Sequence, residues 1–118
     1  MTGFTLTLPL PPSMNGAWAN VPGKGRVLTT GARKWKDGIT TLIQSGVRPS
    51  QAVTGKYDVL LEVPEAMAGD IDNRIKIALD GLVKSGRAPD DRHVREVTVR
   101  RVAGIARNDC RLTVTEAA

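Results

Sequence analysis

Five aspartates lie around Lys76 between Gly69 and Asp91, in a chain that is otherwise basic. They are Asp70, Asp72, Asp80, Asp90 and Asp91. Carboxylates gathered in this way repel one another unless a cation lies among them. Ligand sets made only of oxygen suit Mg²⁺ or Mn²⁺ better than zinc. The segment therefore predicts a divalent-metal site of the kind that neutralises charge at a reacting phosphate.

The spacing of the first two aspartates predicts that they act together. Asp70 and Asp72 are two residues apart, where an extended segment enters a predicted helix. In extended backbone such residues point to the same side, so both carboxylates can face one ion. Lys76 follows Asp72 by four residues and is expected on the same side, where its ammonium can neutralise the scissile phosphate. Asp90 is a candidate for a further ligand, or for a group that hydrogen-bonds to the ligands.

Each of these residues also has a structural interpretation. Asp72 could be only a helix N-cap, and Lys76 only its ion-pair partner one turn further on. Asp80 is interpreted as structural, in the same kind of pair with Lys84. The acidic pair that ends the segment could be turn chemistry alone, since it follows Pro89.

The charge of the whole chain favours a polyanionic partner. The 118 residues carry a formal net charge of +5, which suits nucleic acid but does not identify it. The candidates for phosphate contacts are Lys24, Arg26, Arg33, Lys36, Arg74, Arg92 and Arg95. Asn15 is a polar candidate that could equally cap its own loop.

The composition also indicates the cellular compartment of the chain. Cys110 is the single cysteine, so no internal disulfide forms and a reducing compartment is expected. No segment approaches the roughly 18 apolar residues that a membrane span requires. The first residues have neither the basic nor the apolar region of a signal peptide. We therefore expect a cytoplasmic protein without a membrane partner.

Apolar periodicity predicts the elements in order. Strands are expected over residues 4–10, 57–63, 94–102 and 110–114. One helix is expected between its N-cap Thr30 and its C-terminal stop Gly46, and a second over Asn73–Ser85. Residues 15–29 are expected to be loop, and residues 104–109 a turn that makes an antiparallel hairpin of the last two strands. The fold class is α/β (α+β), a single domain over residues 1–118 with a mixed sheet of about four strands and two main helices, in the order β-α-β-α-β-β.

The helices show the apolar stripes of an amphipathic element. The predicted buried residues are Ala32, Trp35, Ile39, Leu42 and Ile43 in the first helix, and Ile75, Leu79, Leu82 and Val83 in the second. Cys110 begins an alternating apolar run and is expected in the core.

Beyond these patterns, the chain resembles the RusA-type Holliday junction resolvases, which are small endodeoxyribonucleases often carried by phages and prophages. The resemblance lies in Asp70-Ile71-Asp72-Asn73, then Lys76, Asp80, Leu82 and Gly86, then Asp90-Asp91, with Pro11-Pro12-Ser13 and Asn15 near the start. These elements match the family in order and spacing over nearly the whole chain.

This resemblance implies a homodimer that binds four-way DNA junctions and nicks two opposing strands with Mg²⁺ or Mn²⁺, in DNA recombination and repair. It assigns Asp70, Asp72 and Asp91 as metal ligands and Lys76 as an essential lysine. Whether Asp91 serves its own chain or the partner's site stays open, because a helix carries the chain away from Asp70 before it returns.

Two other functions remain as alternatives at this point. One is a non-catalytic basic DNA-binding phage protein, against which the acidic cluster argues, since unneutralised carboxylates repel a phosphate backbone. The other is a metal-dependent nuclease that acts on other branched DNA, because a metal site does not encode the shape of the substrate.

Overall fold

The structure is a computed structural model that describes residues 2–13 and 18–117, except for the side chains of Trp18 and Arg26. Its strands are β1 (Gly3–Pro9), β2 (Trp18–Val21), β3 (Gly25–Leu28), β4 (Tyr57–Pro64), β5 (Val94–Val102) and β6 (Asp109–Glu116). Its helices are α2 (Thr30–Gly46) and α3 (Ile75–Lys84). Three short 3₁₀ helices, η1 (Pro49–Gln51), η2 (Ile71–Arg74) and η3 (Asp91–His93), lie in the connections.

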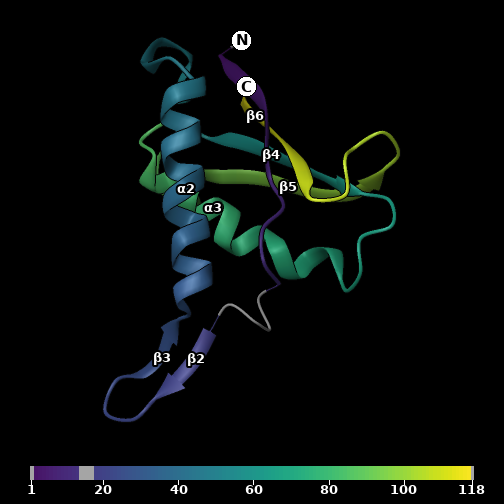
Figure 1. Cartoon of the computed structure of the whole chain (residues 1–118). Coiled ribbons are helices and arrows are strands. Elements are labelled where there is room, and N and C mark those ends of the chain that lie inside the picture. The colour runs from purple at the N-terminus through teal and green to yellow at the C-terminus, as the bar shows by residue number, and fades with distance from the viewer. Residues whose placement is uncertain (1, 14–17, 118) are drawn as a thin grey trace.

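Four strands form one mixed sheet in the order β1-β6-β4-β5 (Figure 1). β6 is antiparallel to both β1 and β4, whereas β5 runs parallel to β4. This confirms the predicted fold class, but the predicted hairpin of β5 and β6 is wrong because β4 lies between them. The six-residue turn suggested a direct pairing, while β5 instead pairs with the strand that precedes α3.

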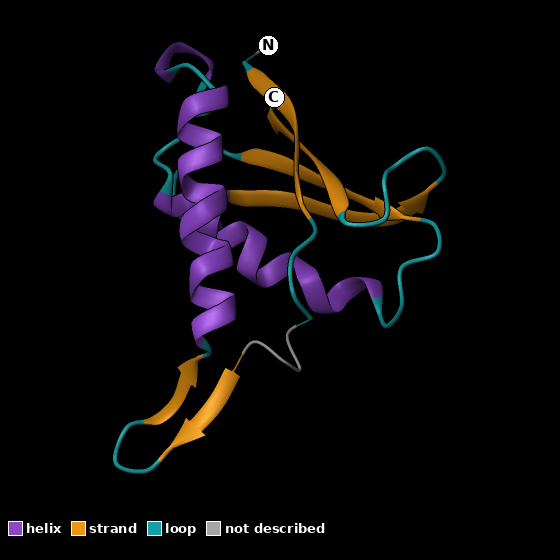
Figure 2. Cartoon of the chain, in the orientation of Figure 1, coloured by secondary structure: helices purple, strands orange, loops and turns teal. Residues whose placement is uncertain are grey.

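Strand alternation gives the sheet one apolar face. Phe4 and Leu8 in β1, Val59 and Leu61 in β4, and Leu112 in β6 are almost fully buried. Register places these residues on one face, since Leu8 pairs with Cys110 and Val59 with Val114. Both helices cover this face, with α3 crossing below the strands and α2 packed against α3 (Figure 2). Cys110 is buried as predicted, and burial raises the pKa of its thiol to about 12.

α2 follows its predicted stripe with one exception. Ala32, Ile39 and Ile43 are buried, and Trp35 packs against the core while its ring N–H donates to the Pro9 carbonyl at 3.3 Å. Leu42 was predicted to be buried but is 45% exposed. It lies at the border of the stripe. Thr29 caps the helix, one residue before Thr30, which the sequence predicts as the N-cap.

α3 begins later than predicted, and its buried residues shift accordingly. The segment from Ile71 to Arg74 forms the 3₁₀ helix η2, so the α-helix starts at Ile75 rather than at Asn73. Ile77, Ala78 and Leu82 are its buried apolar residues, whereas the predicted Ile75, Leu79 and Val83 are only partly buried.

Residues 15–29 were predicted to be loop, but they contain the hairpin of β2 and β3. The turn is closed by the Lys24 amide, which donates to the Val21 carbonyl at 3.0 Å. Gly23 and Gly25 have φ values of +79° and +73°, a conformation that glycine adopts readily. The flanking strands are only four residues long, too short to show alternation. The hairpin extends from the N-terminal end of α2, away from the main sheet (Figure 1).

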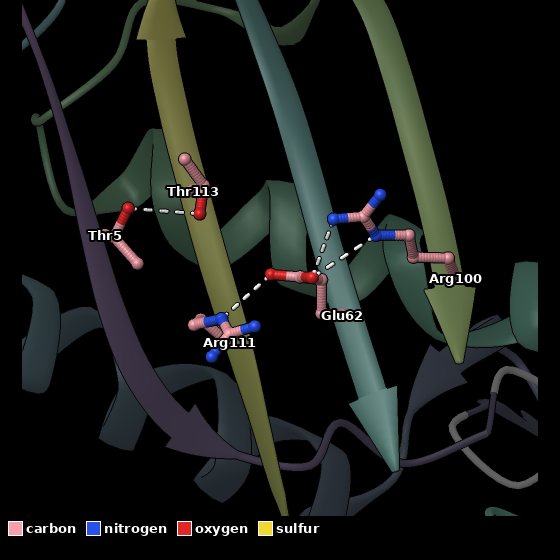
Figure 3. Close-up of polar contacts among 5 residues, drawn as sticks. All are labelled: Thr5, Glu62, Arg100, Arg111 and Thr113. Carbon is pink, nitrogen blue, oxygen red and sulfur yellow. Dashed lines mark hydrogen bonds and ion pairs between the residues drawn. The ribbon is translucent and has the colours of Figure 1, made fainter. Parts of the chain in front are cut away.

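The second face of the main sheet carries polar residues (Figure 3). Thr5 donates a hydrogen bond to Thr113 at 3.1 Å across β1 and β6. Glu62, at 4% exposure, accepts from Arg111 at 2.8 Å and from Arg100 at 2.9 Å. The two arginines come from the strands on either side of β4, so one carboxylate links three strands. Hydrogen bonds from Arg111 chiefly lower the pKa of Glu62.

No helix within the described part of the chain is both long enough and apolar enough to cross a membrane.

We expect the substitution Glu62→Gln to lower the free energy of unfolding at neutral pH by about 1–2 kcal/mol. The bonds lost are charge-assisted, although the guanidinium partners remain half in water. Since the pKa of Glu62 is lowered by folding, this contribution is complete above its ordinary value of 4.5 and is lost as the pH falls through the lowered value.

Thermal denaturation of both proteins between pH 7 and pH 3 checks this. The difference in Tm should be constant near neutrality and should shrink at the acidic end. A difference that stays the same at every pH would show that packing, not charge, accounts for the loss.

Candidate active site

A small hollow lies where α3 faces the turn that leads into β5. Its volume is about 300 Å³, and it is lined by Lys76, Asp80, Val83, Lys84, Asp90 and Asp91. Three of the five clustered aspartates therefore line one surface together with Lys76 and Lys84. The parallel pairing of β4 with β5 explains this arrangement of side chains. A parallel strand must begin beside the start of β4, so the crossover through α3 returns the chain to that end of the sheet.

Lys76 is the centre of the hollow. Its ammonium donates to Asp91 at 3.1 Å and lies 3.3 Å from Asp80. The hydrogen bond to Asp91 is the main cause that raises the pKa of Lys76, with Asp80 adding to it. The lysine is therefore held as a cation. Asp80, which we interpreted as structural through Lys84, pairs with Lys76 instead, while Lys84 binds Asp37 of α2 at 2.7 Å.

The turn that carries Asp90 and Asp91 is fixed from two sides. Asp90 caps η3 by accepting from the Arg92 amide at 3.0 Å, and this bond chiefly lowers its pKa. Tyr57, fully buried at the start of β4, donates its hydroxyl to the Pro89 carbonyl at 2.8 Å. Burial raises the pKa of Tyr57 to about 12, and the two aspartates add to the shift. The alternating pattern of β4 predicted Tyr57 only as a core residue, and nothing in the sequence ties it to this turn.

Asp70 and Asp72 lie at the other end of the segment and are both exposed. Asp70 is extended, with φ −80° and ψ 139°, but Asp72 lies inside η2. The prediction that both residues share one extended stretch is therefore wrong, and so is the prediction that Asp72 caps α3. A 3₁₀ helix turns once in three residues, so the α-helical i,i+4 relation of Asp72 to Lys76 does not apply.

The donor set of these residues fits a hard divalent cation. Asp70, Asp72 and Asp91 offer only carboxylate oxygens, which Mg²⁺ and Mn²⁺ prefer. Among the residues that the structure describes, however, no three or more acidic, histidine or cysteine side chains form a group that could hold a metal ion. Asp91 is engaged by Lys76. The structure thus brings together the lysine and the distal aspartates, but it does not gather the three predicted ligands.

Two of the predicted phosphate contacts are accessible near the hollow, and they differ in their partners. Arg92 follows Asp91 and is exposed, with no ion pair to a carboxylate among the described residues. Arg95 is held by Asp58 through two hydrogen bonds of 3.0 and 2.6 Å. The charge of Arg95 is therefore largely neutralised within the chain, whereas that of Arg92 is available.

The other predicted contacts are spread over the molecule. Lys24 is exposed at the tip of the β2–β3 hairpin, and Lys36 is half-buried on α2. Arg33 donates to the Leu28 carbonyl at 3.3 Å. Arg74 donates to the Pro11 carbonyl at 2.6 Å. The prediction on Asn15 lies outside the described residues, as does the side chain of Arg26.

Comparison with known proteins identifies the family. The family model of the endodeoxyribonuclease RusA matches residues 9–115, which include every element of the hollow. The chain belongs to the RusA family. Membership makes it an endodeoxyribonuclease, an enzyme that hydrolyses phosphodiester bonds within DNA.

Curated RusA proteins align with this chain from end to end. The crossover junction endodeoxyribonucleases RusA of Shigella sonnei and of Escherichia coli K12 are each 28% identical over 117 residues, which cover 98% of this chain and 97% of theirs. The protein of that name from Enterobacteria phage HK97 is 26% identical over 116 residues. The resemblance inferred from the aspartate segment is thus confirmed.

We expect Lys76→Ala to remove most nicking activity while it changes the free energy of unfolding by less than about 1 kcal/mol, since exposed ion pairs contribute little to stability. Lys84→Ala is the matched stability control, because both lysine side chains are 55% exposed and each forms an ion pair from α3. Lys34→Ala, a change at an exposed lysine on α2 that does not line the hollow, controls for loss of charge in the activity assay. A large loss of thermal stability with normal specific activity would show that Lys76 is structural.

The arginine pair gives a second prediction. Removing a phosphate contact should reduce the slope of log affinity against log salt concentration by about one. We expect Arg92→Ala to do so, and Arg95→Ala to have a smaller effect because Asp58 already neutralises that guanidinium. DNA affinity measured over a salt series for both variants checks this. Equal changes in slope would mean that the Asp58 pair opens on DNA.

Proposed function

We propose that this RusA-family nuclease resolves four-way DNA junctions in recombination and repair, by symmetric nicks that depend on Mg²⁺ or Mn²⁺. The observation that carries the proposal is the Lys76 ammonium, fixed by Asp80 and Asp91 on the surface of the crossover. The named substrate of the curated relatives, a crossover junction, supports the choice of DNA structure.

Lys76 has the properties that charge stabilisation at phosphorus requires. Its pKa is raised, so it stays protonated throughout the physiological range. Asp91 and Asp80 hold the ammonium from two sides, which limits its reorganisation when negative charge develops on a phosphate. In this proposal the Lys76 ammonium replaces its hydrogen bond to one of these carboxylates with a hydrogen bond to a phosphate oxygen of the DNA. The basic side chains of Arg92 and the hairpin residue Lys24 would hold the flanking backbone.

Asp70, Asp72 and Asp91 are the residues that would hold the metal, and Asp90 would support them from the turn. A bound Mg²⁺ or Mn²⁺ ion supplies positive charge at the scissile phosphate and favours ionisation of the attacking water. Lys76 forms ion pairs with both Asp91 and Asp80. If Asp91 turned to the metal, Asp80 would therefore still serve as the counter-ion of the ammonium.

A homodimer is the assembly that this function calls for, because two symmetric sites suit two symmetric nicks. Two arrangements of Asp91 remain to be separated. Within one chain it already reaches Lys76, in the first turn of α3. Alternatively, it completes the metal site of the partner.

Mixing Asp70→Asn protein with Asp91→Asn protein separates the two arrangements. If the site is shared between chains, one of the two sites in the mixed dimer has no lesion, and nicking of one strand returns. If each chain builds its own site, both sites stay broken and no nicking returns. Self-mixtures of each variant provide the background.

We expect Asp70→Asn, Asp72→Asn and Asp91→Asn each to abolish nicking of junction DNA while binding survives. Each change weakens the metal site and at the same time reduces repulsion of the DNA. Glu96→Gln, a change at an exposed glutamate on β5 that does not line the hollow, makes the same change in net charge and should nick normally. Junction binding by gel shift, and nicking in Mg²⁺, should be measured on the same preparations. Undiminished cleavage by two of the three variants would contradict the metal assignment.

A further inference from the structure

A second and larger pocket lies at the opposite end of the parallel strands. Its volume is about 760 Å³, and it opens between the loop that follows β4 and the turn that joins β5 to β6. Both connections lie at the same end of the sheet (Figure 1). This is where the carboxyl ends of β4 and β5 meet, the usual position of ligands in sheets with parallel strands. None of the residues predicted to bind metal lines it.

The walls of the pocket combine apolar surface with a few polar groups. Leu10, Met67, Val102 and Ile105 supply aliphatic surface, while Arg107 and Asn108 supply polar groups from the turn. Pockets of roughly 300–1,000 Å³ with this mixture are typical of sites for small organic groups. A nucleobase has the matching character, with two apolar faces and a polar edge.

Arg74 bonds two backbone carbonyls in one wall of the pocket, and its Nε–H donor has no partner there. Its guanidinium lines the pocket and donates to the carbonyls of Pro11 at 2.6 Å and Ala68 at 3.3 Å. The Nε atom of Arg74 is buried, and it has no hydrogen-bond partner among the described residues. An unpaired buried donor is costly, and an acceptor on an entering ligand would relieve it after a small shift of the side chain.

The pocket is tied directly to the segment that carries the chemistry. Arg101 of β5 donates to the Gly69 carbonyl at 2.6 Å, and its guanidinium also lies 3.5 Å from the Met67 carbonyl. The loop that forms one wall therefore leads without a break into Asp70. DNA whose backbone is at Asp70 would have its neighbouring nucleotides at the mouth of this pocket.

We propose that this pocket receives one unstacked base of the DNA, next to the nicked phosphate at the branch point. This inference rests on the proposed junction nuclease function. Extruding a base costs least where it is already poorly stacked or unpaired, which favours branch points over continuous duplex. Arg107 at the turn would lie against the face of the base, as guanidinium groups do on aromatic rings. Base capture would then contribute to selectivity for branched DNA.

The test uses four-way junctions with 2-aminopurine at single positions around the branch point. Its fluorescence rises when the base leaves the stack. Measurements in EDTA prevent cleavage, so the result is independent of whether the protein nicks junctions. We expect the bound wild type to raise emission at one branch-point position. Ala103→Phe, which fills the mouth from an exposed lining position, should abolish the rise without loss of binding.

Ala106→Phe is the matched control, because Ala106 is exposed in the same turn but does not line the pocket. It should keep the rise. No rise with bound wild-type protein would overturn the proposal, and so would a rise that survives in Ala103→Phe. If Ala103→Phe does not fold, Arg107→Ala should reduce the rise relative to the exposed control Arg48→Ala, and an unchanged signal would likewise overturn the proposal.

Discussion

The bond between Lys76 and Asp91 joins the two ends of a crossover, and the site depends on it. Lys76 lies in the first turn of α3, and Asp91 lies just before β5. Their contact at 3.1 Å requires that β5 return beside β4 in parallel, since only then does the turn at residues 89–91 come back to the helix. Tyr57 fixes the same turn from within the core. Packing and electrostatics thus set the position of one ammonium group.

The rest of the molecule distributes its charges around this arrangement. On the polar face of the sheet, Glu62 forms ion pairs with both Arg100 and Arg111, so one carboxylate offsets one of these two positive charges and links three strands. Arg92 and Lys24 keep theirs exposed. The net charge of +5 therefore overstates how many basic groups face DNA in any one place. Asp70 and Asp72 lie in the chain between Ala68 and Arg74, which line the larger pocket, and shortly before Lys76 of the hollow.

Periodicity was sufficient to predict the main strands, the helices and the buried cysteine, because alternation and helical stripes are local properties of the sequence. It did not predict the pairing of β5 with β4, because the paired residues are about forty positions apart in the sequence. It missed the β2–β3 hairpin, whose strands are too short to alternate, and the 3₁₀ helix η2, which no residue type marks.

The same limits apply to the site. The aspartate and lysine spacing indicated the chemistry, and the RusA resemblance was correct. Local spacing, however, assigned the wrong partners. Lys76 was placed with Asp72 and Asp80 with Lys84, whereas the crossover brings Asp91 to Lys76 and α2 brings Asp37 to Lys84. Asp80 forms its i,i+4 pair with Lys76 rather than with Lys84. Spacing within the helix allowed several such pairs, and contacts between elements, which spacing does not report, decided among them.

We propose that these residues form a metal-dependent nuclease for four-way junctions. The most direct measurement maps nicks at nucleotide resolution on end-labelled four-way, forked and linear DNA of the same sequence, with Mg²⁺, Mn²⁺ or EDTA. We expect paired nicks, placed symmetrically across the branch point, on the four-way junction only and only with a metal. Equal cleavage of forked or linear DNA, or nicking that persists in EDTA, would contradict it.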